Sequence, residues 1–83
     1  MYELIYSRNA LKALEKFERN IRERVIAGLE KLRIQPESHD IKRLAGMPGY
    51  RFRIGDYCII FDLDKNKQQI LVLKIGHRKN IYG

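Results

Sequence analysis

The stretch YRFRIGDYCIIFDLDKNKQQILVLKIGHRKNIY, residues 50–82, decides the fold of this chain. Its first residues alternate apolar side chains with Arg51 and Arg53, which is the period of a half-buried strand with a cationic face in water. Gly55-Asp56 then predicts a two-residue hairpin turn, because glycine readily takes the positive φ that such turns need. The whole stretch predicts an antiparallel meander of three strands, over residues 50–54, 57–63 and 69–75.

The predicted turn also sets a register between the first two strands. On the apolar face the expected pairs are Ile54 with Tyr57, Phe52 with Ile59 and Tyr50 with Phe61. On the cationic face they are Arg53 with Cys58 and Arg51 with Ile60. The third strand is apolar on both sides, with Ile70 and Val72 on one side and Leu71, Leu73 and Ile75 on the other, so we expect it to be central or covered.

The residues before this stretch predict one strand and two helices. The strand covers residues 2–6, and Ser7 is the expected N-cap of a first helix. Asn20 is the expected N-cap of a second helix, with Glu23 as its capping-box acid, and Gln35-Pro36 ends that helix. We expect the helices to form an antiparallel hairpin. Gly28, in the second helix, predicts close packing against the sheet or the first helix.

Residues 37–49 are expected to form an irregular connection. The predicted fold class is therefore α+β: an N-terminal strand, a helix hairpin and a three-stranded meander, forming a small, mostly antiparallel sheet packed on the helices. With 83 residues, the chain is expected to be a single domain, 1–83, that buries roughly 60% of its unfolded surface.

Composition narrows the function classes. The chain has 17 Lys and Arg against 10 Asp and Glu, a net charge of +7, which suits a phosphate backbone or an acidic protein partner. No apolar run is long enough for a membrane span and the N-terminus does not resemble a signal peptide, so we expect a cytoplasmic protein without membrane contact. Cys58, His39 and His77 form no metal-binding pattern, and we expect no metal and no cofactor.

The chemistry of the chain is concentrated near its C-terminus. Paired carboxylates and nucleophile-base pairs are missing from the sequence, but cations and a phenol gather on or beside the predicted meander. These candidate site residues are Arg51, Arg53, Lys74, His77, Arg78, Lys79 and Tyr82. Such a surface fits a polyanion, and RNA binding needs only cations and aromatic side chains.

RNA cleavage by the RNA's own 2'-hydroxyl needs more than binding. The hydroxyl must lose a proton, charge on the phosphate must be stabilised, and the 5'-oxygen must be protonated. Guanidinium groups can stabilise the phosphate charge. His77 and Tyr82 are the candidates for proton transfer, and an imidazole, with a reference pKa near 6.5, is better suited than a phenol near 10.

Two segments, LAGMPGYRFRIGDYCIIFDLD (44–64) and LKIGHRKNIY (73–82), resemble the RelE/ParE superfamily of toxins from toxin-antitoxin pairs. The family hallmark reads roughly L-x-G…Y-R-x-R-x-G-x-Y-R-x-x-Y, then G-H-R and a tyrosine near the end. The resemblance covers the whole chain, including the order of strand, helix hairpin and meander. It implies an endoribonuclease that cuts mRNA in the ribosomal A site and is held off by a small antitoxin, whereas ParE members poison DNA gyrase.

The resemblance also implies roles for particular residues. Arg51 and Arg53 would aid proton transfer and charge stabilisation, Arg78 would hold the phosphate, and Tyr82 would activate the hydroxyl or stack on a base. Lys74 and Lys79 are candidates for RNA binding on the ground of their charge, and not of the resemblance. The hallmark arginine after G-D-Y, which contacts the scissile phosphate, is Cys58 in this chain.

Three functions therefore stay open. The leading one is a metal-independent endoribonuclease that cleaves mRNA on the ribosome, weakened to some degree by Cys58. The second is a ParE-like inhibitor that contacts gyrase as a protein. The third is a member with little catalysis that mainly binds its antitoxin. In each case the basic surface predicts an acidic antitoxin segment that folds on binding.

Overall fold

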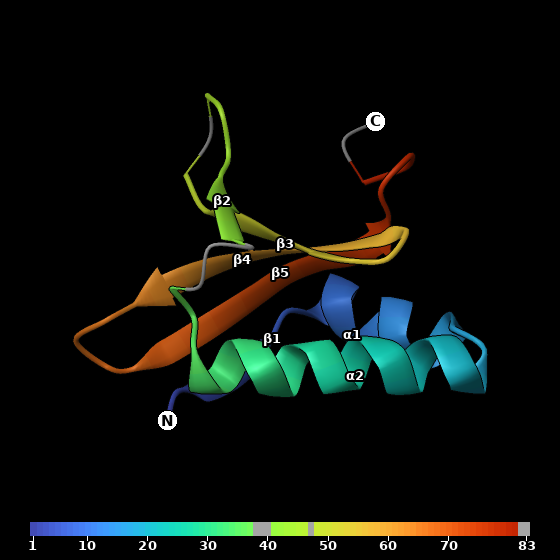
Figure 1. Cartoon of the computed structure of the whole chain (residues 1–83), viewed down its shortest axis with the longest axis horizontal. Coiled ribbons are helices and arrows are strands. Elements are labelled where there is room, and N and C mark those ends of the chain that lie inside the picture. The colour runs from blue at the N-terminus through green and yellow to red at the C-terminus, as the bar shows by residue number, and fades with distance from the viewer. Residues whose placement is uncertain (38–40, 47, 82–83) are drawn as a thin grey trace.

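The chain folds as a pair of helices against one face of a five-stranded sheet, in a computed structural model that describes residues 1–37, 41–46 and 48–81 (Figure 1). The elements are β1 (Glu3–Tyr6), α1 (Arg8–Lys16), α2 (Arg19–Ile34), β2 (Ile41–Arg43), β3 (Tyr50–Ile54), β4 (Tyr57–Asp64) and β5 (Gln69–His77). The strand order is β1-β5-β4-β3-β2, with β1 parallel to β5 and every other pair antiparallel. The predicted α+β class and the central position of β5 are confirmed.

The β3–β4 hairpin has the register expected from its turn. Ile54 pairs with Tyr57, Phe52 with Ile59, Tyr50 with Phe61, Arg53 with Cys58 and Arg51 with Ile60. Gly55 has a φ of +58°, in the left-handed region where a side chain would be strained. The turn chemistry alone was therefore enough to fix which side chains share a face.

The faces of β5 differ from the prediction. Ile60 pairs with Lys74 and Phe61 with Val72, so Leu73 is an extra residue, a β-bulge. Beyond it the side chains change faces, and Ile75 joins Ile70 and Val72 in the core instead of lying with Leu71 and Leu73. The prediction of strict alternation along this strand was wrong, because a period of two would have sent Lys74 into the core.

The expected irregular connection over 37–49 contains a strand. β2 is short, and it pairs with β3 through Ile41 with Phe52, Lys42 with Arg51 and Arg43 with Tyr50. Three residues are too few for an alternating pattern to be recognised in the sequence, and the strand is formed by its hydrogen-bonded pairing with β3. The sheet thus has one strand more than the predicted N-terminal strand and meander.

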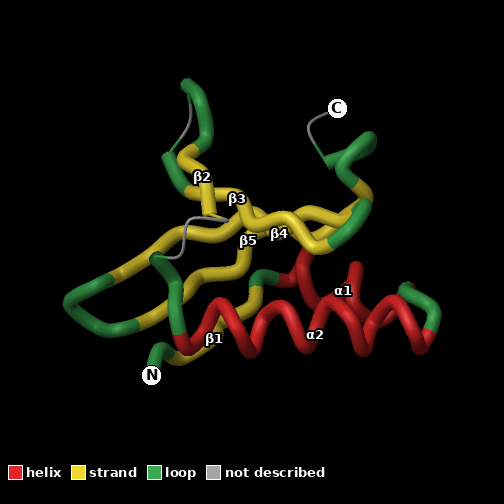
Figure 2. The backbone as a smooth tube through the Cα atoms, in the orientation of Figure 1, coloured by secondary structure: helices red, strands yellow, loops and turns green. Residues whose placement is uncertain are grey.

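The helices lie side by side on one face of the sheet and run in opposite directions, as expected (Figure 2). Ser7 is the N-cap of α1, and its side chain accepts a hydrogen bond from the backbone N–H of Ala10 at 3.1 Å. The predicted cap of α2 was wrong: Glu18 is the N-cap and Asn20 lies inside the helix. The early start is visible in the backbone, since the N–H of Arg22 donates to the carbonyl of Glu18 at 2.8 Å. The guanidinium of Arg22 also donates to the carbonyls of Leu14 and Phe17 at the end of α1.

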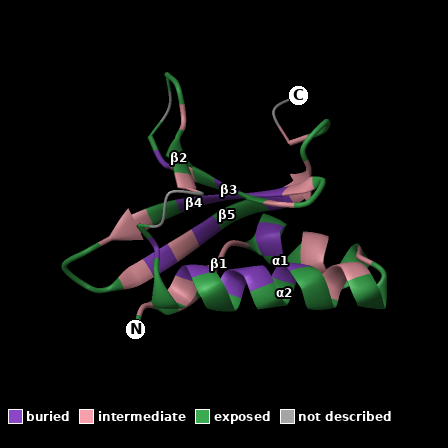
Figure 3. Cartoon of the chain, in the orientation of Figure 1, coloured by how far each residue is buried: buried purple, intermediate pink, exposed green. Residues whose placement is uncertain are grey.

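The core lies between the helices and the sheet, where α2 turns a buried stripe toward the strands (Figure 3). Phe61, Leu29 and Ile59 are fully buried there. Gly28 packs as closely as predicted, because a Cβ atom added to it would clash with Cδ1 of Ile54. Close approach of α2 to β3 therefore depends on a residue without a side chain.

Candidate nucleic-acid interface

The face of the sheet that the helices leave uncovered carries basic side chains. The β2–β3 connection and the C-terminal tail rise on this side, and the helices lie on the other (Figures 1 and 2). We call it the cationic face, defined by the exposed side chains of Lys42, Arg51, Arg53 and Lys74 around the buried Cys58 and Ile60. The strand register, not sequence proximity, brings them together.

The pairing arranges these residues in two rows across the strands. One row runs from Lys42 on β2 through Arg51 and Ile60 to Lys74 on β5. The other runs from Arg53 through Cys58 to Gly76. Adjacent strands are about 4.8 Å apart, so the first row spans roughly 14 Å, which is long enough to follow a single RNA strand over more than one phosphate.

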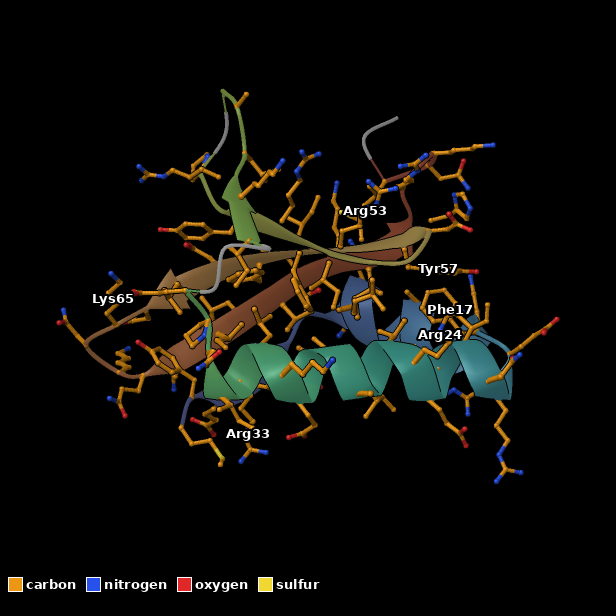
Figure 4. All side chains as sticks on the ribbon, in the orientation of Figure 1. Phe17, Arg24, Arg33, Arg53, Tyr57 and Lys65 are labelled. Carbon is orange, nitrogen blue, oxygen red and sulfur yellow. The ribbon has the colours of Figure 1, made fainter. Side chains whose placement is uncertain are left out.

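The turn at Gly55-Asp56 is the point where Arg53 and the tail meet. The Nε of Arg53 donates to the carbonyl of Gly55 at 3.2 Å, and the backbone N–H of Arg78 donates to the carbonyl of Asp56 at 2.9 Å. From the helix side, Arg24 reaches the same turn, since a Cβ atom added at Gly55 would lie 3.1 Å from its Nη2. Arg53 thus rises above the sheet while Arg24 lies on the helix side (Figure 4).

His77 is not brought to the cationic face by its strand. It pairs with Tyr57, whose side chain belongs to the helix-packed face, and the two rings meet edge to face at 5.5 Å. Tyr57 in turn packs edge to face on Phe17, the C-cap of α1, with ring centroids 5.2 Å apart (Figure 4). The Nδ1 of His77 accepts a hydrogen bond from the backbone N–H of Lys79 at 3.2 Å, so in the neutral ring Nε2 carries the proton.

The tail after His77 folds back in a tight turn. The backbone N–H groups of Asn80 and Ile81 both donate to the carbonyl of His77, and Ile81 lies against Gly76. Arg78 and Lys79 are exposed on this turn, beside the end of the hairpin. Tyr82, the predicted proton-transfer or stacking residue, lies outside the described residues.

A groove with a basic rim adjoins the cationic face at the edge of β5, where β1 has already ended. Its walls are α1, the second half of β5 and the tail, and its basic residues are Lys12, Lys16 and Lys74. Phe17, Ile75 and Ile81 give it an apolar lining. The groove extends the basic surface from the sheet toward α1.

Two residues of this region were missed by sequence reasoning. Lys42 was hidden in the stretch expected to be irregular, and only its pairing with Arg51 places it on the cationic face. Arg24 was not among the candidate site residues, and no local signal in the sequence points from it to Gly55. In the described ranges no group of three His, Cys, Asp or Glu side chains is arranged to hold a metal ion. Within the same ranges, no helix has the length and apolarity needed to cross a membrane.

The chain is similar to known proteins both in sequence and in structure. Residues 4–82 match the family described as the ParE toxin of the type II toxin-antitoxin system parDE. No curated protein sequence matches. Among solved structures, the isolated RelE toxin of Escherichia coli is similar with a TM-score of 0.81 and 25% identity, covering 99% of this chain and 92% of RelE.

Two complexes show the same fold. The archaeal RelE–RelB complex from Pyrococcus horikoshii matches with a TM-score of 0.77 and 26% identity, over 95% of this chain and 97% of the other. The RelBE2 toxin-antitoxin complex from Mycobacterium tuberculosis matches with 0.83 and 21%, over 93% and 98%. The chain is thus a RelE/ParE superfamily toxin with a RelE-like fold, and it belongs to the ParE toxin family of type II toxin-antitoxin systems.

Proposed function

We propose that this toxin is an endoribonuclease that cleaves mRNA, on the ribosome, by attack of the RNA's own 2'-hydroxyl on the adjacent phosphate. The observation that carries the proposal is the cationic face, which lies on the side of the sheet opposite α1 and α2. Arg51 and Arg53 are exposed on it, and Arg78 lies beside the same hairpin turn. Phosphate chemistry needs cationic donors grouped in this way, and guanidinium groups supply them well, whereas docking onto a protein does not require such a group.

The proposed roles follow from what each group can supply. Arg53 and Arg78 stabilise the charge that develops on the phosphate oxygens, since both guanidinium-bearing residues flank the Gly55-Asp56 turn. Arg51 binds a neighbouring phosphate, and Lys79 adds a further contact to the RNA backbone. Tyr82 is the proposed proton-transfer residue, or the residue on which a base stacks.

His77 fits a supporting role better than a direct one. Its ring packs on Tyr57, and its Nδ1 receives the N–H of Lys79, so it shapes the turn that carries Arg78. His77 as a whole is half-buried. Its Nε2, on the exposed edge of the ring, is kept in the proposal as a second candidate for proton transfer.

Cys58 lowers the expected rate. Its side chain is 3% exposed and lies between Arg53 and Gly76, where a thiol provides no fixed positive charge. One lost charge-assisted contact to the phosphate would slow cleavage by about 10-fold to 100-fold if it acts in the transition state. The proposed enzyme is therefore slow for its class.

We further propose an acidic antitoxin as the cognate partner. The similar structures from P. horikoshii and M. tuberculosis are complexes of a toxin with an antitoxin. The +7 charge of this chain favours a partner of opposite charge, which would cover the cationic face.

The second candidate is inhibition of DNA gyrase by protein contact. The observation in its favour is the sequence match, since residues 4–82 fit the family named for ParE. A third reading, a member that only binds its antitoxin, is supported by Cys58 alone.

Induced expression without antitoxin, followed by mapping of new mRNA 5' ends, separates these candidates. The proposed function predicts cuts inside translated codons within minutes, which disappear in Arg78→Ala and weaken in Tyr82→Phe. Growth arrest with intact mRNA and DNA damage would support gyrase instead. Absence of both arrest and cuts would leave antitoxin binding as the function.

A further inference from the structure

The bulge in β5 decides which of its side chains lies on the cationic face. Phe61 pairs with Val72 and Ile60 with Lys74, which leaves Leu73 unpaired with any residue of β4. In a regular strand, Lys74 would oppose Ile59 and point into the core. The bulge therefore puts an ammonium group on the cationic face and returns Ile75 to the core.

Ser7 holds this bulge in position. Its Oγ donates to the carbonyl of Leu73 at 2.7 Å, and its backbone N–H donates to the carbonyl of Val72 at 2.9 Å. The same Oγ accepts the N–H of Ala10 and so caps α1. The junction between β1 and α1 thus satisfies the carbonyl that the bulge exposes, and the position of Lys74 is built into the fold.

Lys74 lies diagonally next to Cys58. Cys58 opposes Gly76, two residues after Lys74 on the same strand face, and such diagonal neighbours have Cα atoms roughly 7–8 Å apart. Lys74 is exposed and lines the groove beside α1. Within the described residues no ion pair joins it to a carboxylate.

We propose that Lys74 supplies, from the neighbouring strand, the positive charge that Cys58 cannot supply to the reacting phosphate. The inference rests on the proposed ribonuclease function. A lysine suits the task because its flexible stem carries a compact charge across one strand spacing. Lys74 would then act in the reaction itself, and not only in holding RNA.

A double-mutant cycle on purified protein, with mRNA on programmed ribosomes, tests this role. Lys74→Ala should slow cleavage by about 10-fold to 100-fold. In a Cys58→Arg background, where position 58 carries its own charge, the same change should cost only about 3-fold or less. Equal losses in the two backgrounds would overturn the inference. Lys67→Ala removes the same charge at the far end of the β4–β5 hairpin and is the matched control, expected to leave the rate unchanged.

A second comparison uses variants of Lys74 alone, so that no arginine has to fit at the buried position 58. Lys74→Arg keeps the charge and should cleave within about 3-fold of wild type, whereas Lys74→Met keeps the length and should lose the full amount. Equal rates in the two variants would mean that position 74 matters only for packing, which contradicts the proposal.

Binding to an uncleavable mRNA, with a 2'-O-methyl group at the cut nucleotide, distinguishes failure of the proposed ribonuclease function from failure of the role proposed for Lys74. Lys74→Met should lower the salt dependence of binding by about one phosphate contact. A wild-type protein that neither cuts nor binds overturns the proposed function and this inference with it. A wild-type protein that cuts, with Lys74→Met unaffected, overturns the inference alone.

Discussion

The two faces of the β3–β4 hairpin are built from alternate residues of the same strands but have opposite tasks. On the helix-packed face Phe52, Ile59 and Phe61 are buried in the core. On the other face Arg51 and Arg53 are exposed, and no helix in the described part of the chain lies on that side of the sheet. Because neighbouring residues point to opposite sides, the fold and the proposed chemistry can be damaged separately within a few residues of chain.

The largest expected effect comes from breaking the helix-packed face. Phe61 is fully buried and stacks on Tyr50 with ring centroids 5.5 Å apart. Phe61→Ala should lower the free energy of unfolding by about 3–5 kcal/mol, measured by urea denaturation. Lys42→Ala, on the cationic face, is the control and should stay within about 0.5 kcal/mol of wild type. Similar losses in both would mean that the faces are not separable.

The reverse experiment removes a charge and leaves the core intact. Arg53→Ala should reduce mRNA cleavage by about 100-fold to 1,000-fold, because a donor to the developing phosphate charge is lost. Its midpoint of urea denaturation should hardly change, since the hydrogen bond to Gly55 is exposed. Unchanged cleavage in a folded Arg53→Ala protein would remove this residue from the site.

A smaller effect is expected at Ser7, which connects the two faces through the bulge. Ser7→Ala loses both the cap of α1 and the donor to Leu73, and should cost about 1–2 kcal/mol. Ser7→Thr keeps both and should remain near wild type. Hydrogen exchange of the amides at 74 and 75 should quicken only in the alanine variant. Equal exchange in the two variants would show that Ser7 does not hold the bulge.

The smallest expected effect concerns alkaline pH. Burial, together with nearby Glu30, raises the pKa of Tyr6, and Arg33 opposes this only in part. A phenol with a higher pKa in the folded state than in the unfolded state gives stability that is present below pH 10 and falls as the pH rises further. Tyr6→Phe should therefore lose less thermal stability between pH 9 and 11 than wild type does. A steeper loss in Tyr6→Phe would show that the sign is wrong.

The parts of the fold that local chemistry specifies were predictable. Gly55-Asp56 fixed the β3–β4 register. Ser7 was correctly predicted as a cap, because a serine hydroxyl accepts a hydrogen bond from a backbone N–H in the first turn of a helix. Asn20 failed as a cap because the backbone N–H of Arg22 already bonds to the carbonyl of Glu18, so the helix starts before Asn20. The guanidinium of Arg22 also reaches the carbonyl of Leu14, eight positions back, a contact that capping rules do not include.

The site was predictable in composition but not in arrangement. Arg51 and Arg53 lie on the expected face, since their placement needs only strand parity. The bulge at Leu73, which moves Lys74 outward and leaves His77 against Tyr57, depends on packing between β5, β4 and Ser7. Lys42 lies on the cationic face only because β2 pairs with β3. β2 is too short for its alternation to reveal this pairing in the sequence.

The most direct test of the central claim is the chemistry of the cut itself. Purified protein is given ribosome-bound mRNA in which the 2'-hydroxyl at the cut nucleotide is either present or replaced by hydrogen. The proposed reaction predicts cleavage of the first to a fragment ending in a 2',3'-cyclic phosphate, and none of the second, although both bind alike. Cleavage of the deoxy substrate at an equal rate, or no cleavage of either, would contradict the assignment of the cationic face as a ribonuclease site.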